Sequence, residues 1–155
     1  MLGLDPSIVQ YRLPLLPHPR PIKQKLRILH PRWSLQVNEE IQKQLSVGFL
    51  SMVKYPEWLA NVVHAPKKDS KVRIYVDFWD LNKASPNDDF SLPHIDMLFD
   101  SIVGHLMLSF MNGFFRHNKI MMVPKDMINM SFITKWGSYY YRVMSFGLKN
   151  AEATY

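Results

Sequence analysis

The sequence predicts an α+β fold, because segments with helical spacing of apolar residues occur among short β-rich runs along its 155 residues. Two of the β-rich runs flank a short polar stretch, which is typical of a hairpin. Hydrophobic residues make up 47% of the chain and charged residues 21%, and this balance indicates a globular protein. A chain of this length can bury one sizeable core.

The first 21 residues are rich in proline, which fixes φ and removes a backbone donor. A stable helix or a central strand is therefore excluded there. We expect residues 1–21 to form an extended lead-in that lies on the rest of the protein or stays mobile. Residues 22–155 then form the folded unit. The prolines of the lead-in are Pro6, Pro14, Pro17, Pro19 and Pro21.

Two later segments have apolar residues at helical spacing. The first is expected to begin at an N-cap, Ser34, and to end at Gly48 after about three turns. The second is expected to begin near Pro93 and to end before Gly104. A last helix is expected to start near Leu148. The residues expected to face inward are Val37, Ile41 and Leu45 in the first helix, and Ile95, Leu98, Phe99 and Ile102 in the second.

The remaining periodic runs predict strands. Trp58 to Pro66 and Val72 to Asp77 form a hairpin around the polar sequence KKDSK. An apolar run from Leu106 to Met111 predicts a buried strand. Trp136 and Gly137 are expected to form the turn of the last strand pair. The other predicted strands are Ile120 to Val123, Phe132 to Thr134 and Tyr139 to Met144.

Composition excludes several classes of protein. The chain has no cysteine, so a disulfide framework and a thiolate metal site are excluded. Its apolar runs are too short to span a bilayer, and no secretory pattern begins the chain, so we expect an intracellular protein without a membrane partner. A net charge of +6 and a pI of about 9.6 permit binding to a polyanion. The aromatic residues could stack on single-stranded nucleic acid, although alternation along a hairpin favours packing for most of them.

The candidate site lies where the predicted strand Leu106 to Met111 ends. The neutral polar residue Asn112 follows the strand and is itself followed by Gly113, where backbone can approach a ligand closely. The hairpin residues Lys67, Lys68 and Arg73 are candidate phosphate ligands, because ammonium and guanidinium groups pair with phosphate oxygens. A solvated basic hairpin is the alternative.

Four ordered stretches resemble the reverse transcriptases of long-terminal-repeat retrotransposons of the Ty3/gypsy type, in their plant form. The most specific is YVDFWDLNKASPNDDFSLPHID, Tyr75 to Asp96. The others are PRPIKQKLRILHPRWSL (Pro19 to Leu35), YPEWLANVVHAPKKDSKVRIYVD (Tyr55 to Asp77) and FITKWGSYYYRVMSFGLKNAEATY (Phe132 to Tyr155). The resemblance extends over nearly everything from about Tyr11 onward.

The resemblance implies the fingers and part of the palm of a right-hand polymerase within a Pol polyprotein, a context shared with DNA integration. The implied activity is RNA-directed DNA synthesis, a nucleotidyl transfer that uses Mg²⁺, deoxynucleoside triphosphates and a primed RNA or DNA template. The implied setting is a cytoplasmic virus-like particle or the nucleus. Asn112 falls at the first metal-binding aspartate. Nucleotide-binding positions fall at Lys67, Lys68, Arg73, Gly113, Phe114, His117, Phe146 and Gly147.

Several residues depart from the family pattern. Asn112 offers Mg²⁺ a neutral amide oxygen, a weak metal ligand without the charge of a carboxylate, and no Tyr-x-Asp-Asp occurs in the sequence. His117 stands where an aromatic residue screens the sugar, and Trp79 stands where an arginine supports the template. The pair Asp88 and Asp89 follows a Pro-Asn dipeptide, which favours a solvated turn over a metal site. We therefore expect an inactive polymerase fragment; the alternatives are a basic nucleic-acid-binding remnant and an unstable, aggregation-prone relic.

Overall fold

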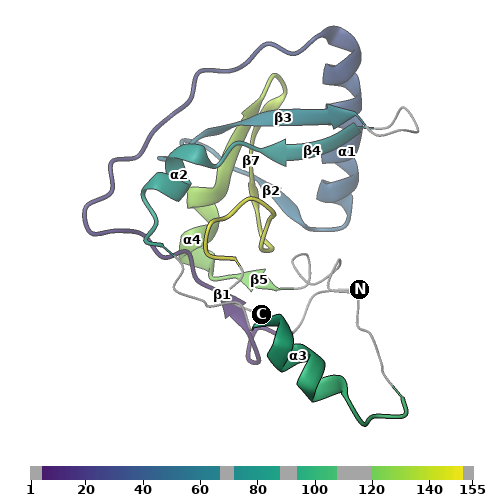
Figure 1. Cartoon of the computed structure of the whole chain (residues 1–155). Helices are drawn as coiled ribbons and strands as arrows, with labels where there is room; N and C mark the ends of the chain where they lie inside the picture. The colour runs from purple at the N-terminus through teal and green to yellow at the C-terminus, as the bar shows by residue number, and fades with distance from the viewer. Residues whose placement is uncertain (1–4, 67–71, 88–93, 108–119, 152–155) are drawn as a thin grey trace.

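A mixed five-stranded β-sheet forms the centre of the protein in the computed structural model, which describes residues 5–66, 72–87, 94–107 and 120–151 (Figure 1). Its strand order is β2-β7-β6-β3-β4, and β1 and β5 form a separate parallel pair. The presence of helices beside this sheet agrees with the predicted α+β class. The elements are β1 (Gln10–Tyr11), α1 (Pro31–Ser46), β2 (Leu50–Met52), β3 (Ala60–Pro66), β4 (Val72–Val76), α2 (Trp79–Lys83), α3 (Ile95–Ile102), β5 (Met121–Met122), α4 (Pro124–Met127), a 3₁₀ turn (Ile128–Met130), β6 (Ser131–Thr134) and β7 (Gly137–Tyr141).

The sheet is built from two hairpins joined by a parallel pair. The β3–β4 hairpin is confirmed, with His64 opposite Ile74. The β6–β7 hairpin is also confirmed, but its turn lies at residues 135–136, so that Gly137 is the first residue of β7. The parallel pairing of β6 with β3 aligns Ala60 with Phe132 and unites the two hairpins. Strand β2, which the sequence did not predict, then adds to the free edge of β7.

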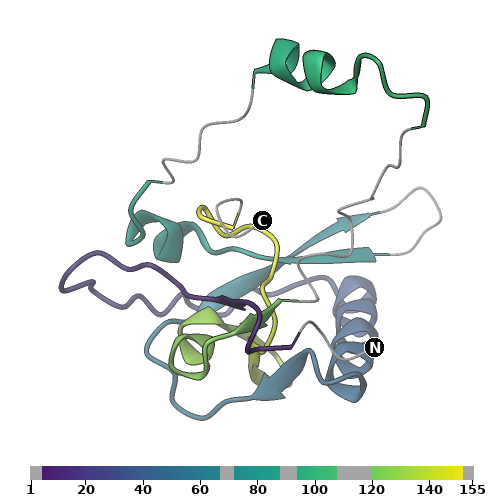
Figure 2. The ribbon, with the colours of Figure 1, turned by 90° about the horizontal axis from the view of Figure 1, so that it is seen from below.

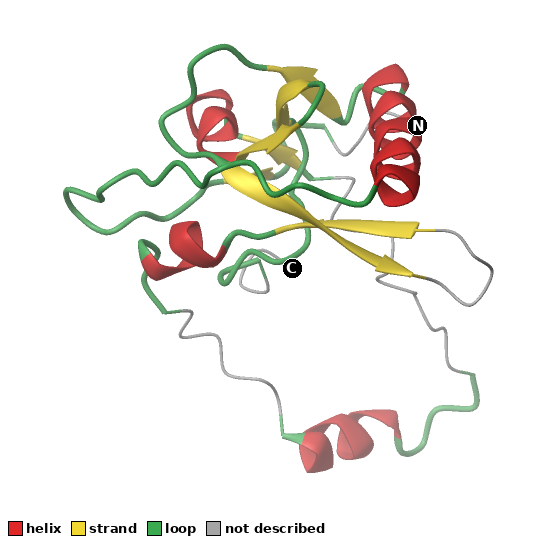
Figure 3. Cartoon of the chain, turned by 90° about the horizontal axis from the view of Figure 1, so that it is seen from above, coloured by secondary structure: helices red, strands yellow, loops and turns green. Residues whose placement is uncertain are grey.

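Helix α1 lies across one face of this sheet, in contact with β2 and β4, the two edge strands (Figure 3). Val37 and Ile41 are each 1% exposed, as the helical spacing predicts. The helix begins earlier than expected, however. Its N-cap is His30, whose Nδ1 accepts a hydrogen bond from the Arg32 backbone N–H at 3.3 Å, because Pro31 suits the first helical position. The N-cap assignment of Ser34 is therefore wrong.

The core lies between α1, the sheet and the first strand. Phe132 is fully buried, and its ring centroid lies 5.8 Å from that of Tyr139 and 5.5 Å from that of Tyr141. These tyrosines pack in the hairpin, as alternation favoured, rather than forming an exposed stacking platform. Tyr11 and Leu13 are buried as well, so this part of the proline-rich lead-in lies on the folded unit. The Leu13 N–H donates to Oδ2 of buried Asp126 at 3.1 Å.

Helix α3 differs from its prediction in one important respect. The helix is present and ends before Gly104, as expected, but none of its residues is buried. In Figure 2 it stands apart from the sheet. The prediction that its apolar residues face inward is therefore wrong. Exposed fractions are 66% for Ile95, 46% for Leu98, 62% for Phe99 and 39% for Ile102.

Two other predicted elements differ from the structure. Leu106 and Met107 are exposed and lie outside any strand, so the buried strand expected from Leu106 is wrong at its start; residues 108–111 lie outside the described part. Residues 148–151 are not helical, and residues 149–150 form a turn where the start of a helix was expected. Among the described residues, no helix combines the length and apolar character needed to cross a membrane.

Candidate functional site

Two of the predicted nucleotide-binding positions lie together in a turn, at Phe146 and Gly147. Gly147 has a φ of +92°, a backbone conformation that a residue with a Cβ rarely adopts. A Cβ at this position would lie 3.9 Å from the carbonyl oxygen of Val76 and 4.0 Å from Cδ2 of Phe78. These are ordinary van der Waals distances, so the positive φ, rather than crowding by β4, favours glycine here.

The turn is fixed to α2 through both ends of one amide side chain. Asn82 Nδ2 donates to the carbonyl oxygen of Gly147 at 2.7 Å, and Asn82 Oδ1 accepts from the backbone N–H of Lys149 at 2.9 Å. Asn150 Nδ2 adds a bond to the carbonyl oxygen of Pro86 at 3.0 Å. Sequence reasoning missed this clamp, since its two halves are distant along the chain and no local pattern joins them.

The start of α2 carries an exposed aromatic ring with one lysine against it. Trp79 is 64% exposed, and Lys83 Nζ lies 4.9 Å from the centroid of its ring, within the range of a cation–π contact. The Trp79 backbone N–H donates to Asp77 Oδ1 at 3.3 Å. Asp77 also faces Arg27, at 4.0 Å from the guanidinium. Lys83 thus lies against the Trp79 ring, and Arg27 lies against Asp77.

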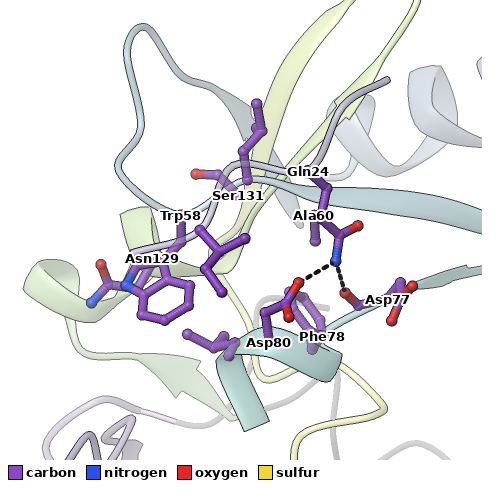
Figure 4. Close-up of a pocket in the computed structure, with 11 residues that line it drawn as sticks. Gln24, Trp58, Ala60, Asp77, Phe78, Asp80, Asn129 and Ser131 are labelled. Atoms are coloured by element: carbon purple, nitrogen blue, oxygen red, sulfur yellow. Dashed lines mark hydrogen bonds between the residues drawn. The ribbon is translucent and has the colours of Figure 1, made fainter. Parts of the chain in front are cut away.

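A small cavity with a mainly apolar lining, including Trp58, Phe78 and Leu81, lies between β3 and α2 (Figure 4). Gln24 Nε2 donates to Asp80 Oδ2 at 2.9 Å and to the carbonyl oxygen of Asp77 at 3.4 Å. Gln24 Oε1 accepts from the backbone and the side chain of Asn61, at 2.9 and 3.1 Å. The cavity volume is about 10 Å³, enough for about one water molecule. A nucleotide does not fit there, so the cavity is a structural feature.

Of the remaining predicted site residues, the structure describes only Arg73. Arg73 is exposed on β4, opposite Ala65. It lies four residues before Asp77, or about 13 Å along an extended strand. Lys67, Lys68, Asn112, Gly113, Phe114 and His117 lie outside the described residues, as do Asp88 and Asp89. The structure therefore unites Phe146 and Gly147 with α2, and sets Arg73 apart from them.

Side chains that could bind a metal ion do not cluster in the described part of the chain. The described ranges hold no cluster of three or more histidine, aspartate or glutamate side chains that could bind a metal ion. Asn112 itself offers a neutral amide oxygen, whereas Mg²⁺ prefers carboxylate and phosphate oxygens. Asn112 lies outside the described residues, so the weak binding of Mg²⁺ there stays a prediction.

The chain is similar in sequence to parts of transposon polyproteins. It is 28% identical over 149 residues to the retrovirus-related Pol polyprotein from transposon 297 of Drosophila melanogaster, covering 89% of this chain and 13% of that polyprotein. It is 27% identical over 143 residues to the Tf2-3 transposon polyprotein of Schizosaccharomyces pombe, covering 92% and 10%. The chain thus spans about a tenth of the length of these relatives. No protein-family model matches it.

Solved structures with a similar fold are reverse transcriptases of the foamy viral protease–reverse transcriptase type. The native crystal structure of the prototype foamy virus protease–reverse transcriptase matches with a TM-score of 0.71 at 20% identity, covering 90% of this chain and 18% of that one. A foamy viral protease–reverse transcriptase in complex with double-stranded DNA matches with a TM-score of 0.70 at 17% identity, covering 93% and 30%. The chain is therefore similar in sequence to a segment of retrotransposon Pol polyproteins, and it has a mixed α/β fold found within retroviral protease–reverse transcriptases.

Proposed function

We propose that this chain is the fingers and the first part of the palm of a retrotransposon reverse transcriptase, of Ty3/gypsy type and plant form. The observation that carries the proposal is the ordered set of four motifs between Pro19 and Tyr155. Similarity to transposon Pol polyproteins over about nine tenths of the chain supports it. The whole enzyme's activity would be template-primed synthesis of DNA on RNA.

Within this proposal the β3–β4 hairpin grips the incoming triphosphate. Arg73 is exposed on β4, and a guanidinium there can pair with two phosphate oxygens at once. Lys67 and Lys68 follow the end of β3 in the sequence and add positive charge. The Phe146–Gly147 turn would lie beside the templating base, held in place by the Asn82 clamp.

The partners of the proposed enzyme are a primed template and deoxynucleoside triphosphates, with the rest of a Pol polyprotein. Support comes from the foamy viral neighbours, which were solved in complex with double-stranded DNA and with an RNA/DNA hybrid. Those complexes concern proteins under 25% identical to this chain. The partners therefore remain part of the proposal and require a direct test.

The 155-residue polypeptide is proposed to be inactive by itself. Mg²⁺ assists nucleotidyl transfer by holding and polarising phosphate oxygens, and Asn112 lacks the negative charge that such an ion needs. The sequence contains no Tyr-x-Asp-Asp that would contribute two more carboxylates. Incubation with a primed RNA template, triphosphates and Mg²⁺ is expected to give no primer extension. Extension above a no-protein control would refute this part of the proposal.

Nucleotide binding tests the proposal independently of catalysis. A fluorescent deoxynucleoside triphosphate is titrated into the wild-type chain, Arg73→Gln and Lys125→Gln, both of which remove one exposed cation. Arg73→Gln is expected to weaken binding about tenfold or more, because a charge-assisted pair to phosphate is lost. Lys125→Gln is expected to bind like wild type. Equal affinities for all three proteins would remove the hairpin from the nucleotide site.

A non-catalytic, nucleic-acid-binding remnant is the second candidate function. The net charge of +6 favours it, together with the neutral side chain at Asn112. It predicts binding to a polyanion whose log affinity falls linearly with log salt, in the absence of any primer extension. A gel shift in low salt that detects no complex would exclude it.

A further inference from the structure

The β3–β4 hairpin has two faces with different surroundings, and α1 lies against one of them (Figure 3). The His64 ring on β3 stacks on the Trp33 ring of α1, with ring centroids 5.1 Å apart. Ile74 of β4 is the cross-strand partner of His64. Because cross-strand partners share a face and alternate residues of a strand face opposite sides, Ile74 faces α1, and its two neighbours along the chain face away.

The face of β4 that points away from α1 carries a cation, an aromatic ring and a carboxylate in a row. These are Arg73, Tyr75 and Asp77. The Asp77 N–H still donates to the carbonyl oxygen of Asn61 at 2.9 Å, so the pairing of the two strands continues to this residue. Alternate residues of a strand lie about 7 Å apart. Arg73 is exposed, Tyr75 is 42% exposed and the Asp77 side chain is 31% exposed.

Tyr75 differs from the strand tyrosines of the core. Tyr139 lies opposite Phe132 and is 3% exposed, because this pair packs beneath α1. Tyr75 lies opposite the smaller side chain of Val63, on the other face of the sheet. A preference of aromatic residues for strands accounts for both positions. Only Tyr75, however, keeps a large part of its ring available to a ligand.

The order of these groups determines how a nucleotide can lie along β4. The triphosphate is proposed to pair with Arg73, at one end of the row. The carboxylate of Asp77, at the other end, repels phosphate, since like charges disfavour each other. With its phosphates at Arg73, the nucleotide therefore extends its sugar and base toward Tyr75. An aromatic side chain in that place can stack on the π-face of a base.

We infer that Tyr75 stacks on the base of the nucleotide whose triphosphate pairs with Arg73, and that this contact favours purines over pyrimidines. The inference rests on the proposed triphosphate site, and it adds a contact to a part of the ligand that Arg73 does not bind. A purine has the larger ring system, so it overlaps more of the tyrosine ring and stacks more strongly. Stacking by itself does not distinguish adenine from guanine, because both present a π-face.

The test separates the base from the phosphates. Isothermal titration calorimetry measures the affinity of the full chain for dATP, dTTP and an abasic deoxyribose triphosphate, which has the same phosphates and no base. The wild-type chain is expected to bind dATP about fivefold or more tightly than the abasic compound, and dTTP with an affinity between the two. Tyr75→Val, which retains a strand-forming residue, is expected to bind all three alike and to keep the wild-type affinity for the abasic compound. Tyr75→Phe is expected to keep the wild-type order, because the ring remains.

Two further variants distinguish the possible failures. Tyr55→Ala removes a ring that is 93% exposed between β2 and β3, and it is expected to bind like wild type. Arg73→Gln is expected to weaken the binding of all three ligands. If it does so while Tyr75→Val leaves dATP affinity unchanged, the stacking inference is overturned and the triphosphate site stands. If Arg73→Gln changes none of the three affinities, the triphosphate site fails and the inference fails with it.

Two other results would overturn the inference alone. The first is an equal loss of affinity for dATP and for the abasic compound in Tyr75→Val, because the ring would then act through the structure of the hairpin. Circular dichroism of each variant establishes whether it is folded. The second is equal affinity of the wild-type chain for dATP, dTTP and the abasic compound, a comparison that requires no variant.

Discussion

Helices α1 and α3 carry the same kind of sequence signal and have different surroundings. Both show apolar residues at helical spacing, and both end near a glycine with positive φ, Gly48 and Gly104. In α1 the apolar residues at this spacing are buried against the sheet, whereas in α3 no residue is buried. Periodicity thus predicts that a helix forms and which side is apolar, but the contact made by that side depends on distant parts of the chain.

The largest effect is expected for a truncation in α1. Ile41 is 1% exposed, and Ile41→Ala should lower the free energy of unfolding by about 3 kcal/mol, through lost burial and a residual cavity. Urea denaturation followed by circular dichroism measures it. A change below about 1 kcal/mol would mean that α1 is not part of the core, and the contrast between the two helices would disappear.

A smaller loss is expected where residues 25–27 are fixed to β3. Asn61 is 4% exposed; its Nδ2 donates to the carbonyl oxygen of Lys25 at 2.8 Å, and its Oδ1 accepts from the Arg27 N–H at 2.8 Å. Asn61→Ala should cost about 2 kcal/mol, because these backbone groups lose their partners. Asn87→Ala, at an exposed position, is the matched control and should leave the urea midpoint unchanged.

The core should also be sensitive to alkaline pH through Tyr141. Burial, followed by the negative charge of Glu40, raises the pKa of Tyr141 above its ordinary value of 10.0. The folded state therefore retains a proton that the unfolded state releases, so stability falls as pH rises above 10. The slope contributed by this one group is at most about 1.4 kcal/mol per pH unit. Tyr141→Phe should flatten the curve of stability against pH in that range, whereas Tyr55→Phe, at a residue 93% exposed, should leave it unchanged.

The smallest effect is expected in α3, for the substitution used in α1. Ile95 is 66% exposed, so Ile95→Ala should change the free energy of unfolding by no more than about 0.5 kcal/mol. Alanine also has the higher helix propensity, which opposes any loss. If Ile95→Ala were as costly as Ile41→Ala in the same urea experiment, the apolar side of α3 would have to be packed in solution.

The elements that sequence reasoning found are those defined by neighbours along the chain. The β3–β4 and β6–β7 hairpins follow from alternation and a short turn, both of which are local. The parallel pairing of Ala60 with Phe132 has no local signature, and neither has the addition of β2 to β7. The N-cap of α1 has a local signal in Pro31, which favours the first helical position, and this signal outweighs the N-cap preference of Ser34.

In the candidate site, too, the features set by local sequence could be predicted, whereas those set by tertiary contacts could not. Arg73 could be placed on a hairpin strand from its sequence context alone, and its exposure follows from the alternation of that strand. The Asn82 clamp on Gly147 could not be predicted, because a side chain in a short helix meets a distant turn only after the sheet has formed. The exposure of Trp79 also depends on tertiary contacts, since an indole is more often buried than solvated.

The parallel pair in the centre of the sheet has a consequence for biosynthesis. Ala60 pairs with Phe132, which is translated much later. Because segments fold in the order in which they emerge from the ribosome, the β3–β4 hairpin forms before β6 is available to pair with it. During that interval one edge of β3 has unpaired amides and carbonyls, which can pair with other nascent chains. Slow closure of such a long-range contact makes this interval the period when newly made protein is most prone to aggregate.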